Sequence, residues 1–209
     1  MSIELSISGT VDTSLEVATQ QRLASLVDAG EPYVLDEYIY ARAAAPPPGA
    51  PTLRVKNLRT ASSGGLPSWT LQIQQVPEPR RAAPRAFQFG VTEFAVDGGH
   101  SPRALATSTG YAHSQFSLRK TGWVYRRGEV EIRLYRLGAI ENERNQLYPD
   151  TLLMSVTTRY RVDSVPGDKT DAARFATNGD SGEQREAALA ALEEIAGHMR
   201  GLVELGRAD

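Results

Sequence analysis

The chain has 209 residues, of which 41% are hydrophobic and 23% charged, a composition typical of a globular domain with a substantial core. Its formal net charge of -2 lacks the basic excess of a nucleic-acid-binding domain. Cysteine is absent, which excludes disulfides, thiolate catalysis and cysteine zinc sites and is typical of the cytosol or nucleus. We expect neither a signal peptide, because no basic region precedes an apolar run, nor a membrane span of about 18 apolar residues.

The first half of the chain predicts five strands and one helix. Apolar and polar residues alternate over 3–11, the period of a strand with one buried face. Thr13 and Glu16 form a capping box, which begins a helix that Gly30 ends. Four more segments have strand character: 33–42, 53–58, 69–73 and 87–96. The stretch 43–51, AAAPPPGAP, is predicted to be a mobile surface loop because it has few apolar side chains that could pack.

A long hairpin at 116–137 is the main feature of the second half. Its first arm is rich in bulky residues, and its second arm alternates from Glu129 onward. Gly128 lies between the arms and supplies the positive φ that a tight hairpin turn needs. Ahead of the hairpin, Ser101 and Pro102 predict a short helix, with a cap residue followed by proline in the first turn. Long twisted hairpins tend to close into barrels, which removes their exposed edges.

The end of the chain combines a strand with a helix. The strand is expected at 152–162 and the helix at 181–205, where an apolar stripe must pack on the barrel or on a partner. We therefore predict an α+β fold with a single domain at 1–209. It is an eight-stranded, mostly antiparallel β-barrel with an N-terminal helix, a short mid-chain helix and a C-terminal helix.

Residues with catalytic or metal-binding chemistry are few. None of the three histidines, His100, His113 and His198, has another at metal-ligand spacing, so ordinary solvated histidines are favoured. There is no Gly-x-Ser-x-Gly elbow and no Walker-type glycine loop. The sequence therefore predicts no metal site, no cofactor and no catalytic residue.

Glu129, Glu131 and Arg133 place two carboxylates and a cation on one face of the second hairpin arm. This pattern resembles the Glu-x-Glu-x-Lys strand of the triphosphate tunnel metalloenzymes, whose carboxylates hold a divalent metal and whose cations hold the triphosphate. It departs from that family because arginine replaces lysine, the pattern lies mid-chain, and the first strand adds only Glu4. Alternating charge on a solvated or polar-lined strand is therefore favoured, and a metal-dependent triphosphate hydrolase is the alternative function.

The hairpin also combines aromatic and basic side chains. The predicted partner-binding residues are Trp123, Tyr125, Arg126, Arg127 and Tyr135. Such a mixture suits stacking on a single-stranded nucleic acid or an interface with an acidic protein, and the slightly acidic chain favours the protein. We expect the apolar residues of the hairpin to help fill the barrel interior, which leaves the aromatic residues for a partner. Those apolar residues are Val130, Ile132 and Leu134.

Short segments, in their order and spacing, carry a family resemblance. In the hairpin they are Phe116, Thr121-Gly122, Tyr125–Gly128, Ile132 and Leu134–Arg136. Nearer the N-terminus they are Leu5–Val11 with Gly9, Ser14–Glu16, Glu31-Pro32 and Leu35–Glu37. Together these segments resemble the Mediator complex subunit 18 family of the head module. The resemblance covers most of 3–162 and is weakest in the C-terminal part, where helical character alone is shared.

This resemblance implies an eight-stranded barrel that is distantly related to the tunnel enzymes but lacks their active site. It implies a heterodimer with Mediator subunit 20, a tether formed by the C-terminal helix of Mediator subunit 8, and a position near the RNA polymerase II stalk region. The implied role is transcription coregulation in the nucleus through protein–protein interaction. It involves no catalysis, no membrane and no sequence-specific nucleic acid.

Overall fold

The computed structural model describes residues 2–27, 30–96, 101–140, 147, 151–162 and 179–207, and these residues form eight β-strands and three α-helices. The strands are β1 (Ser2–Asp12), β2 (Gly30–Ala41), β3 (Thr52–Thr60), β4 (Ser68–Gln74), β5 (Phe87–Val96), β6 (His113–Arg127), β7 (Val130–Gly138) and β8 (Thr151–Arg161). The helices are α1 (Glu16–Leu26), which follows a 3-10 turn at Thr13–Leu15, α2 (Pro102–Ser108) and α3 (Gly179–Met199).

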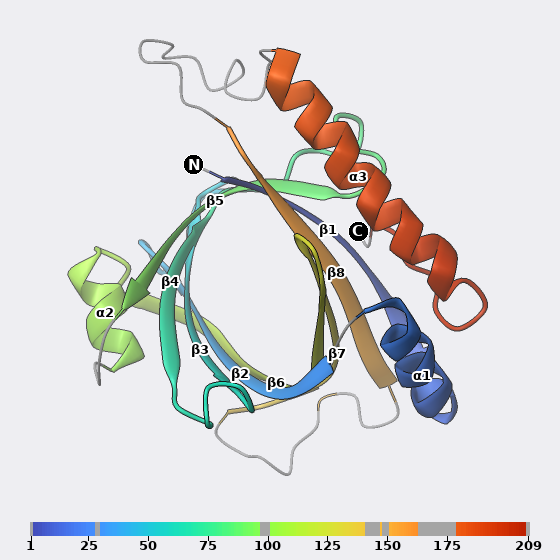
Figure 1. Ribbon diagram of the computed structural model, residues 1–209. Coiled ribbons are helices and arrows are strands. Elements are labelled where there is room, and N and C mark those ends of the chain that lie inside the picture. Colours follow the sequence, from blue (N-terminus) through green and yellow to red (C-terminus); the bar gives the residue numbers. More distant parts are fainter. Residues whose placement is uncertain are drawn as a thin grey trace.

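The strands close into an antiparallel barrel in the order β1-β5-β4-β3-β2-β6-β7-β8 (Figure 1). Two meanders, β2 to β5 and β6 to β8, are joined by the pairing of β2 with β6. β1 pairs with both β5 and β8 and thereby closes the barrel. The predicted α+β class, the eight-stranded barrel and its three helices are thus confirmed in the part of the chain that the structure describes.

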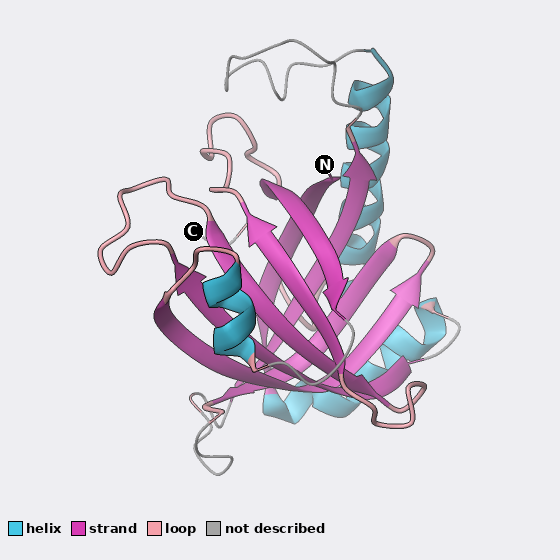
Figure 2. Ribbon diagram, turned by 90° about the vertical axis from the view of Figure 1, so that its left-hand side faces the viewer, coloured by secondary structure: helices cyan, strands magenta, loops and turns pink. Residues whose placement is uncertain are grey.

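The apolar faces of the strands point outward, where the helices cover them. In β1, Ile3 and Leu5 are buried in one cluster with Leu192 and Ile195 of α3. A second cluster, which includes Leu53 of β3, lies beneath α2 on another wall of the barrel (Figure 2). Successive side chains of a strand point to opposite faces of the sheet, so the alternate positions line the barrel interior. These positions include many charged residues and a smaller apolar cluster of Tyr33, Leu35 and Val124.

The expectation that Val130, Ile132 and Leu134 fill the barrel interior is wrong. These residues are buried in the outer cluster, together with Leu23 of α1 and residues of α3. The reason is the size of the helices. A helix about 10 Å across cannot enter an eight-stranded barrel, whose interior is just wide enough for side chains, so the apolar strand face turns outward to meet it.

The start of the first helical segment also differs from the predicted capping box. The side chain of Asp12, the last residue of β1, accepts a hydrogen bond of 2.8 Å from the Ser14 backbone N–H. Asp12 is therefore the cap, and Thr13 already lies in the 3-10 turn. The carboxylate of Asp12 provides the same acceptor chemistry that the prediction assigned to the hydroxyl of Thr13.

The C-terminal helix α3 ends before the predicted residue 205. Gly201 follows it with a φ of 85°, the left-handed conformation that commonly terminates helices. The chain then returns to the barrel, where Ser8 and Gly206 exchange two backbone hydrogen bonds of 2.8 and 3.1 Å. Gly9 permits this approach, because a Cβ at that position would lie 2.5 Å from a backbone oxygen of the returning chain.

The proline-rich stretch 43–51 joins β2 to β3 over the surface, and residues 43–49 are exposed. Its mobility stays a prediction. Within the described ranges, no helix combines the length and the apolar character that a bilayer crossing requires.

Candidate functional site

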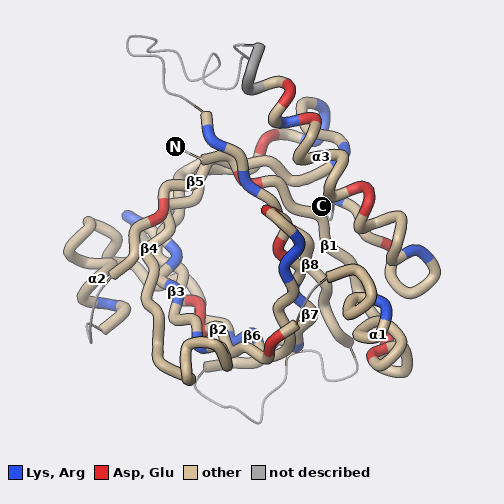
Figure 3. The backbone as a smooth tube through the Cα atoms, in the orientation of Figure 1, with Lys and Arg blue, Asp and Glu red and all other residues tan. Residues whose placement is uncertain are grey.

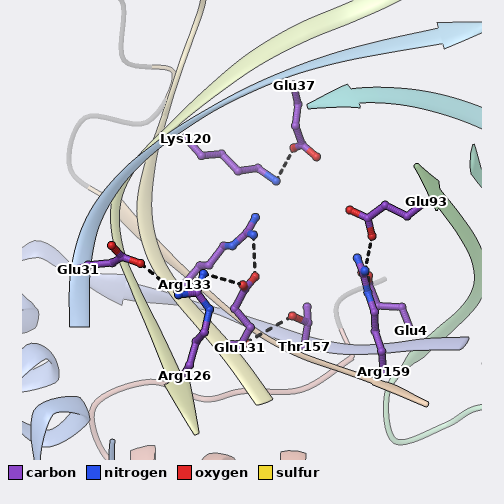
Figure 4. Close-up of polar contacts among 10 residues, drawn as sticks. All are labelled: Glu4, Glu31, Glu37, Glu93, Lys120, Arg126, Glu131, Arg133, Thr157 and Arg159. Carbon is purple, nitrogen blue, oxygen red and sulfur yellow. Dashed lines mark hydrogen bonds and ion pairs between the residues drawn. The ribbon is translucent and has the colours of Figure 1, made fainter. Parts of the chain in front are cut away.

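Charged residues recur along the strands of the barrel (Figure 3), and many of them occupy inward positions. These inward positions alternate with those of the outward apolar residues. The carboxylates are Glu4 of β1, Glu37 of β2, Glu93 of β5 and Glu131 of β7, and the cations are Arg54 and Lys56 of β3, Lys120 of β6, Arg133 of β7 and Arg159 of β8. We call these residues the interior charge cluster. Figure 4 shows most of them extending from different walls toward the centre of the barrel.

Glu37 is the most enclosed carboxylate of this cluster, with 2% of its surface exposed. Lys120 Nζ lies 2.6 Å from one of its oxygens, and Arg54 Nη1 lies 3.4 Å from the other. Burial raises the pKa of Glu37, but Lys120, Lys56 and Arg54 together lower it more, so the pKa of this carboxyl lies below its ordinary value. Glu37 is therefore ionised at neutral pH.

Arg159 joins two carboxylates that come from different strands. Its Nη2 lies 2.7 Å from Glu4, and its Nη1 contacts Glu93. Burial lowers the pKa of Arg159, but the two carboxylates raise it more, so the guanidinium remains charged. Glu131 forms an ion pair of 2.6 Å with Arg133, which lies two residues further along β7 on the same face. Each carboxylate of the cluster thus has a cation within ion-pair distance.

Lys56 differs from the other cations of the cluster, because it makes no ion pair with any residue that the structure describes. It is the register partner of Glu37 across β2 and β3. Burial lowers the pKa of Lys56 to about 8, an effect that Glu37 and Glu4 oppose and that Arg133 reinforces. The ammonium group is therefore held near several charges without a direct counter-ion.

The predicted partner-binding residues lie on two faces of the hairpin and do not form one patch. Trp123, Tyr125 and Arg127 occupy outward positions, whereas Arg126 and Tyr135 occupy inward positions. Trp123 is 38% exposed, but Tyr125 is only 3% exposed and packs in the outer core. The expectation that the aromatic residues are all available to a partner is therefore wrong for Tyr125, because the core beneath the helices includes it.

The other three predicted residues have contacts within the chain. These contacts are Arg126–Glu31 at 3.1 Å, Arg127–Glu194 of α3 at 2.8 Å, and Lys120 Nζ at 5.3 Å from the centroid of the Tyr135 ring. The two arginine side chains are nevertheless 53% and 41% exposed, so they remain accessible from solvent. Their positive charges are partly neutralised by the chain's own carboxylates, which weakens the electrostatic attraction of an acidic partner.

Trp123 borders an outer groove of about 660 Å³ between the start of α1 and strands β2, β6 and β7. Apolar groups such as Pro32 and Leu134 line it. An ion pair of 2.8 Å between Arg136 and Glu16 also lines it. We call this feature the Trp123 groove. It combines an apolar surface with charged groups at one exposed site.

Sequence reasoning found only part of the interior charge cluster. It singled out Glu4, Glu131 and Arg133, but it grouped them with Glu129, which is exposed in the turn between β6 and β7 and does not share the interior face. A signal for the rest was present, because charged residues recur at alternate positions of β3. Such a pattern is equally typical of a strand whose polar face meets solvent.

The described ranges contain no cluster of side chains that is arranged as a metal site. No group of three or more His, Cys, Asp or Glu side chains there is placed to hold a metal ion. His113 lies on β6 and His198 on α3, and His100 lies outside the described residues. The interior carboxylates instead contact arginine or lysine.

Comparison with known proteins identifies the fold. No protein-family model and no curated protein matches the chain. A chain from the Mediator head module of Schizosaccharomyces pombe is 15% identical with a TM-score of 0.72, and the match covers 99% of this chain and 98% of that chain. The PH1819 protein of Pyrococcus horikoshii OT3 is 12% identical with a TM-score of 0.61, covering 99% and 94%. The PH1012 protein of the same organism is 16% identical with a TM-score of 0.52, covering 98% and 94%. At these identities the similarity shows a common fold.

Proposed function

We propose that the chain is a non-catalytic, protein-interaction subunit of a Mediator head module, of the subunit 18 type. The observation that carries this proposal is the match to a head-module chain, which extends over almost the full length of both chains at a TM-score of 0.72. The hairpin and N-terminal segments that resemble the subunit 18 family support the same assignment. In this role the protein acts in the nucleus as a transcription coregulator for RNA polymerase II.

The proposed partners follow from the same assignment. They are Mediator subunit 20 in a heterodimer, the C-terminal helix of Mediator subunit 8, and the RNA polymerase II stalk region. The Trp123 groove is the proposed docking site for the subunit 8 helix, because its apolar lining suits the apolar stripe of an amphipathic helix. Arg136 and Glu16, which line the groove, offer both signs of charge to the polar flank of such a helix.

Trp123→Ala is expected to weaken the complex with the subunit 8 helix by roughly thirtyfold, since truncating an aromatic interface anchor commonly costs about 2 kcal/mol or more. The measurement is a titration of the purified chain with the helix as a synthetic peptide. Phe94→Ala is the matched control, because Phe94 is an aromatic residue that is 52% exposed, against 38% for Trp123, and it does not line the groove. If the peptide binds the wild type and Trp123→Ala with the same affinity, the interface lies elsewhere on the chain.

The alternative function is metal-dependent hydrolysis of a triphosphate, which a barrel interior with carboxylates and cations could in principle support. We expect no phosphate release from inorganic triphosphate or nucleoside triphosphates with magnesium or manganese, because the interior carboxylates are already paired with cations. The assay should be run on the wild type and on a Glu4→Gln, Glu131→Gln double variant. Turnover in the wild type that the double variant loses would replace the non-catalytic proposal with an enzyme.

A further inference from the structure

The first residues of strand β6 have a neighbouring strand on one side only. Most residues from His113 to Tyr125 pair with β2, whereas the pairing of β6 with β7 begins at Arg119. Among the residues that the structure describes, none pairs with 113–118 on the side that faces away from β2. We call residues 113–118 the free edge of β6. A strand edge with unpaired backbone N–H and C=O groups is a template for pairing with another extended chain.

Ser117 directs its backbone groups toward this unpaired side. In an antiparallel sheet, every second residue of a strand exchanges hydrogen bonds with the same neighbour. Arg127 and Val130 flank the two-residue turn of the β6–β7 hairpin, and the pair that closes such a turn is hydrogen-bonded. Every second residue before Arg127 therefore points its N–H and C=O the same way. Ser117 lies beyond the last pair with β7, so its N–H and C=O face the free side.

The free edge has two unlike faces. Phe116 is 51% exposed and supplies an apolar surface on one face. Ser114 lies on the other, outer face, because it is the register partner of Tyr40, which packs in the cluster beneath α2. Gln115 has no register partner in β2, so β6 bulges there, and bulges are common beside binding sites. A strand added at this edge would meet an apolar side chain on one face and polar groups on the other.

A polar pocket of about 500 Å³ adjoins the outer face of the free edge. It is lined by His113, Ser114 and Gln115 of β6, by Tyr40 and by Arg103 of α2. Arg103 is exposed and forms no ion pair or hydrogen bond among the described residues. Burial raises the pKa of Tyr40 and Arg103 opposes this effect, which indicates that the guanidinium lies near the Tyr40 hydroxyl. No carboxylate is among the described residues that line the pocket, so its charge complements an acidic side chain.

We propose that the free edge of β6 binds an extended peptide segment of a partner protein as an added strand, with an Asp or Glu side chain of that segment paired with Arg103. The backbone of the segment supplies the hydrogen bonds that the free edge lacks, and an apolar side chain on one of its faces contacts Phe116. The acidic side chain enters the pocket from the other face and accepts charge-assisted hydrogen bonds from Arg103. In this mode of recognition the backbone pairing gives affinity and the pocket gives specificity. The site is separate from the Trp123 groove and does not rest on the Mediator assignment.

The test begins with a displayed library of short random peptides, selected against the full chain. The enriched peptides should combine Asp or Glu with β-branched or aromatic residues, which favour the extended conformation. The strongest peptide is then synthesised and titrated by fluorescence anisotropy. Arg103→Gln and Ser117→Pro should each weaken its binding by roughly tenfold or more, because the first removes the counter-charge and the second a backbone N–H of the edge.

Both variants are expected to remain folded. Arg103 has no partner within the described chain to lose, and proline is tolerated where the backbone N–H of an edge strand faces solvent. Circular dichroism of each free variant checks this. Arg85→Gln is the matched control, because it removes an exposed cation that pairs with α3 far from the pocket lining, and it should bind the peptide as the wild type does.

Methylated peptides test the backbone pairing directly. Methylation of every second backbone nitrogen removes the donors on one edge of the peptide strand. One alternate set should abolish binding, whereas the other set, which faces solvent, should leave the affinity nearly unchanged. Equal effects of the two sets would overturn the proposal, as would wild-type affinity in both Arg103→Gln and Ser117→Pro. Failure to enrich any peptide that binds saturably would overturn it too, and so would binding that Trp123→Ala abolishes, since the peptide would then occupy the Trp123 groove.

Discussion

Gly122→Ala is expected to destabilise the chain by more than about 4 kcal/mol, the range of the most severe single substitutions. A Cβ at Gly122 would lie 2.0 Å from the Leu134 carbonyl oxygen and 2.7 Å from Tyr135 Cα. Both atoms belong to the backbone of β7, and Gly122 is also paired with Tyr33 of β2 on its other side. The strand cannot move away from one neighbour without disrupting the other. Chemical denaturation followed by circular dichroism measures the loss.

Gly197→Ala is the matched control for this prediction. Gly197 lies in α3, and nothing is found within 4 Å of the Cβ that alanine would add. Alanine has a higher helix propensity than glycine, so this variant should gain up to about 1 kcal/mol of stability. The two Gly→Ala changes are thus expected to have opposite signs. A Gly122→Ala variant as stable as the wild type would show that β6 and β7 do not approach so closely.

Glu37→Gln is expected to reduce the free energy of unfolding by about 3–5 kcal/mol, the usual effect of removing one partner from a buried ion pair. The neutral amide has nearly the same shape, but it leaves Lys120 and Arg54 without the carboxylate that they contact. Glu186→Gln is the control, because Glu186 on α3 forms an exposed ion pair with Arg85. Exposed pairs contribute about 0–1 kcal/mol, so the control should unfold at nearly the wild-type denaturant concentration.

The pH dependence of stability provides a second readout for Glu37. Its pKa in the folded chain is lowered from the ordinary value of 4.5, so the unfolded chain takes up this proton at a higher pH than the folded chain does. The stabilisation is therefore fully present above about pH 4.5 and is lost as the pH falls through the lower folded-state pKa. The wild type should lose stability more steeply below pH 4.5 than Glu37→Gln. Parallel pH profiles for the two proteins would contradict the ion-pair assignment.

The positions of the strands follow from the sequence alone, because alternation and turn chemistry are local properties. Gly128 illustrates this: it was predicted to provide a positive φ between two hairpin arms, and it has a φ of 56° between β6 and β7. The alternation also separates Tyr125 from Arg126, since neighbouring residues of a strand point to opposite faces. Alternation alone therefore divides the five predicted partner-binding residues between the two faces of the hairpin.

Which strand face lies inside the barrel was decided only by the tertiary structure. Ile132 and Arg133 are adjacent in β7, and the sequence determines that they point to opposite sides without determining which side is the interior. The answer depends on α1 and α3, whose apolar stripes need an apolar surface and can find it only on the outer wall of a narrow barrel. Arg133 consequently points inward and meets Glu131, while other interior charges come from strands far apart in the chain, such as Glu37 and Lys120. The sequence by itself determined the strands and the sidedness within each of them, and the packing of the helices decided that the charged side would become the interior.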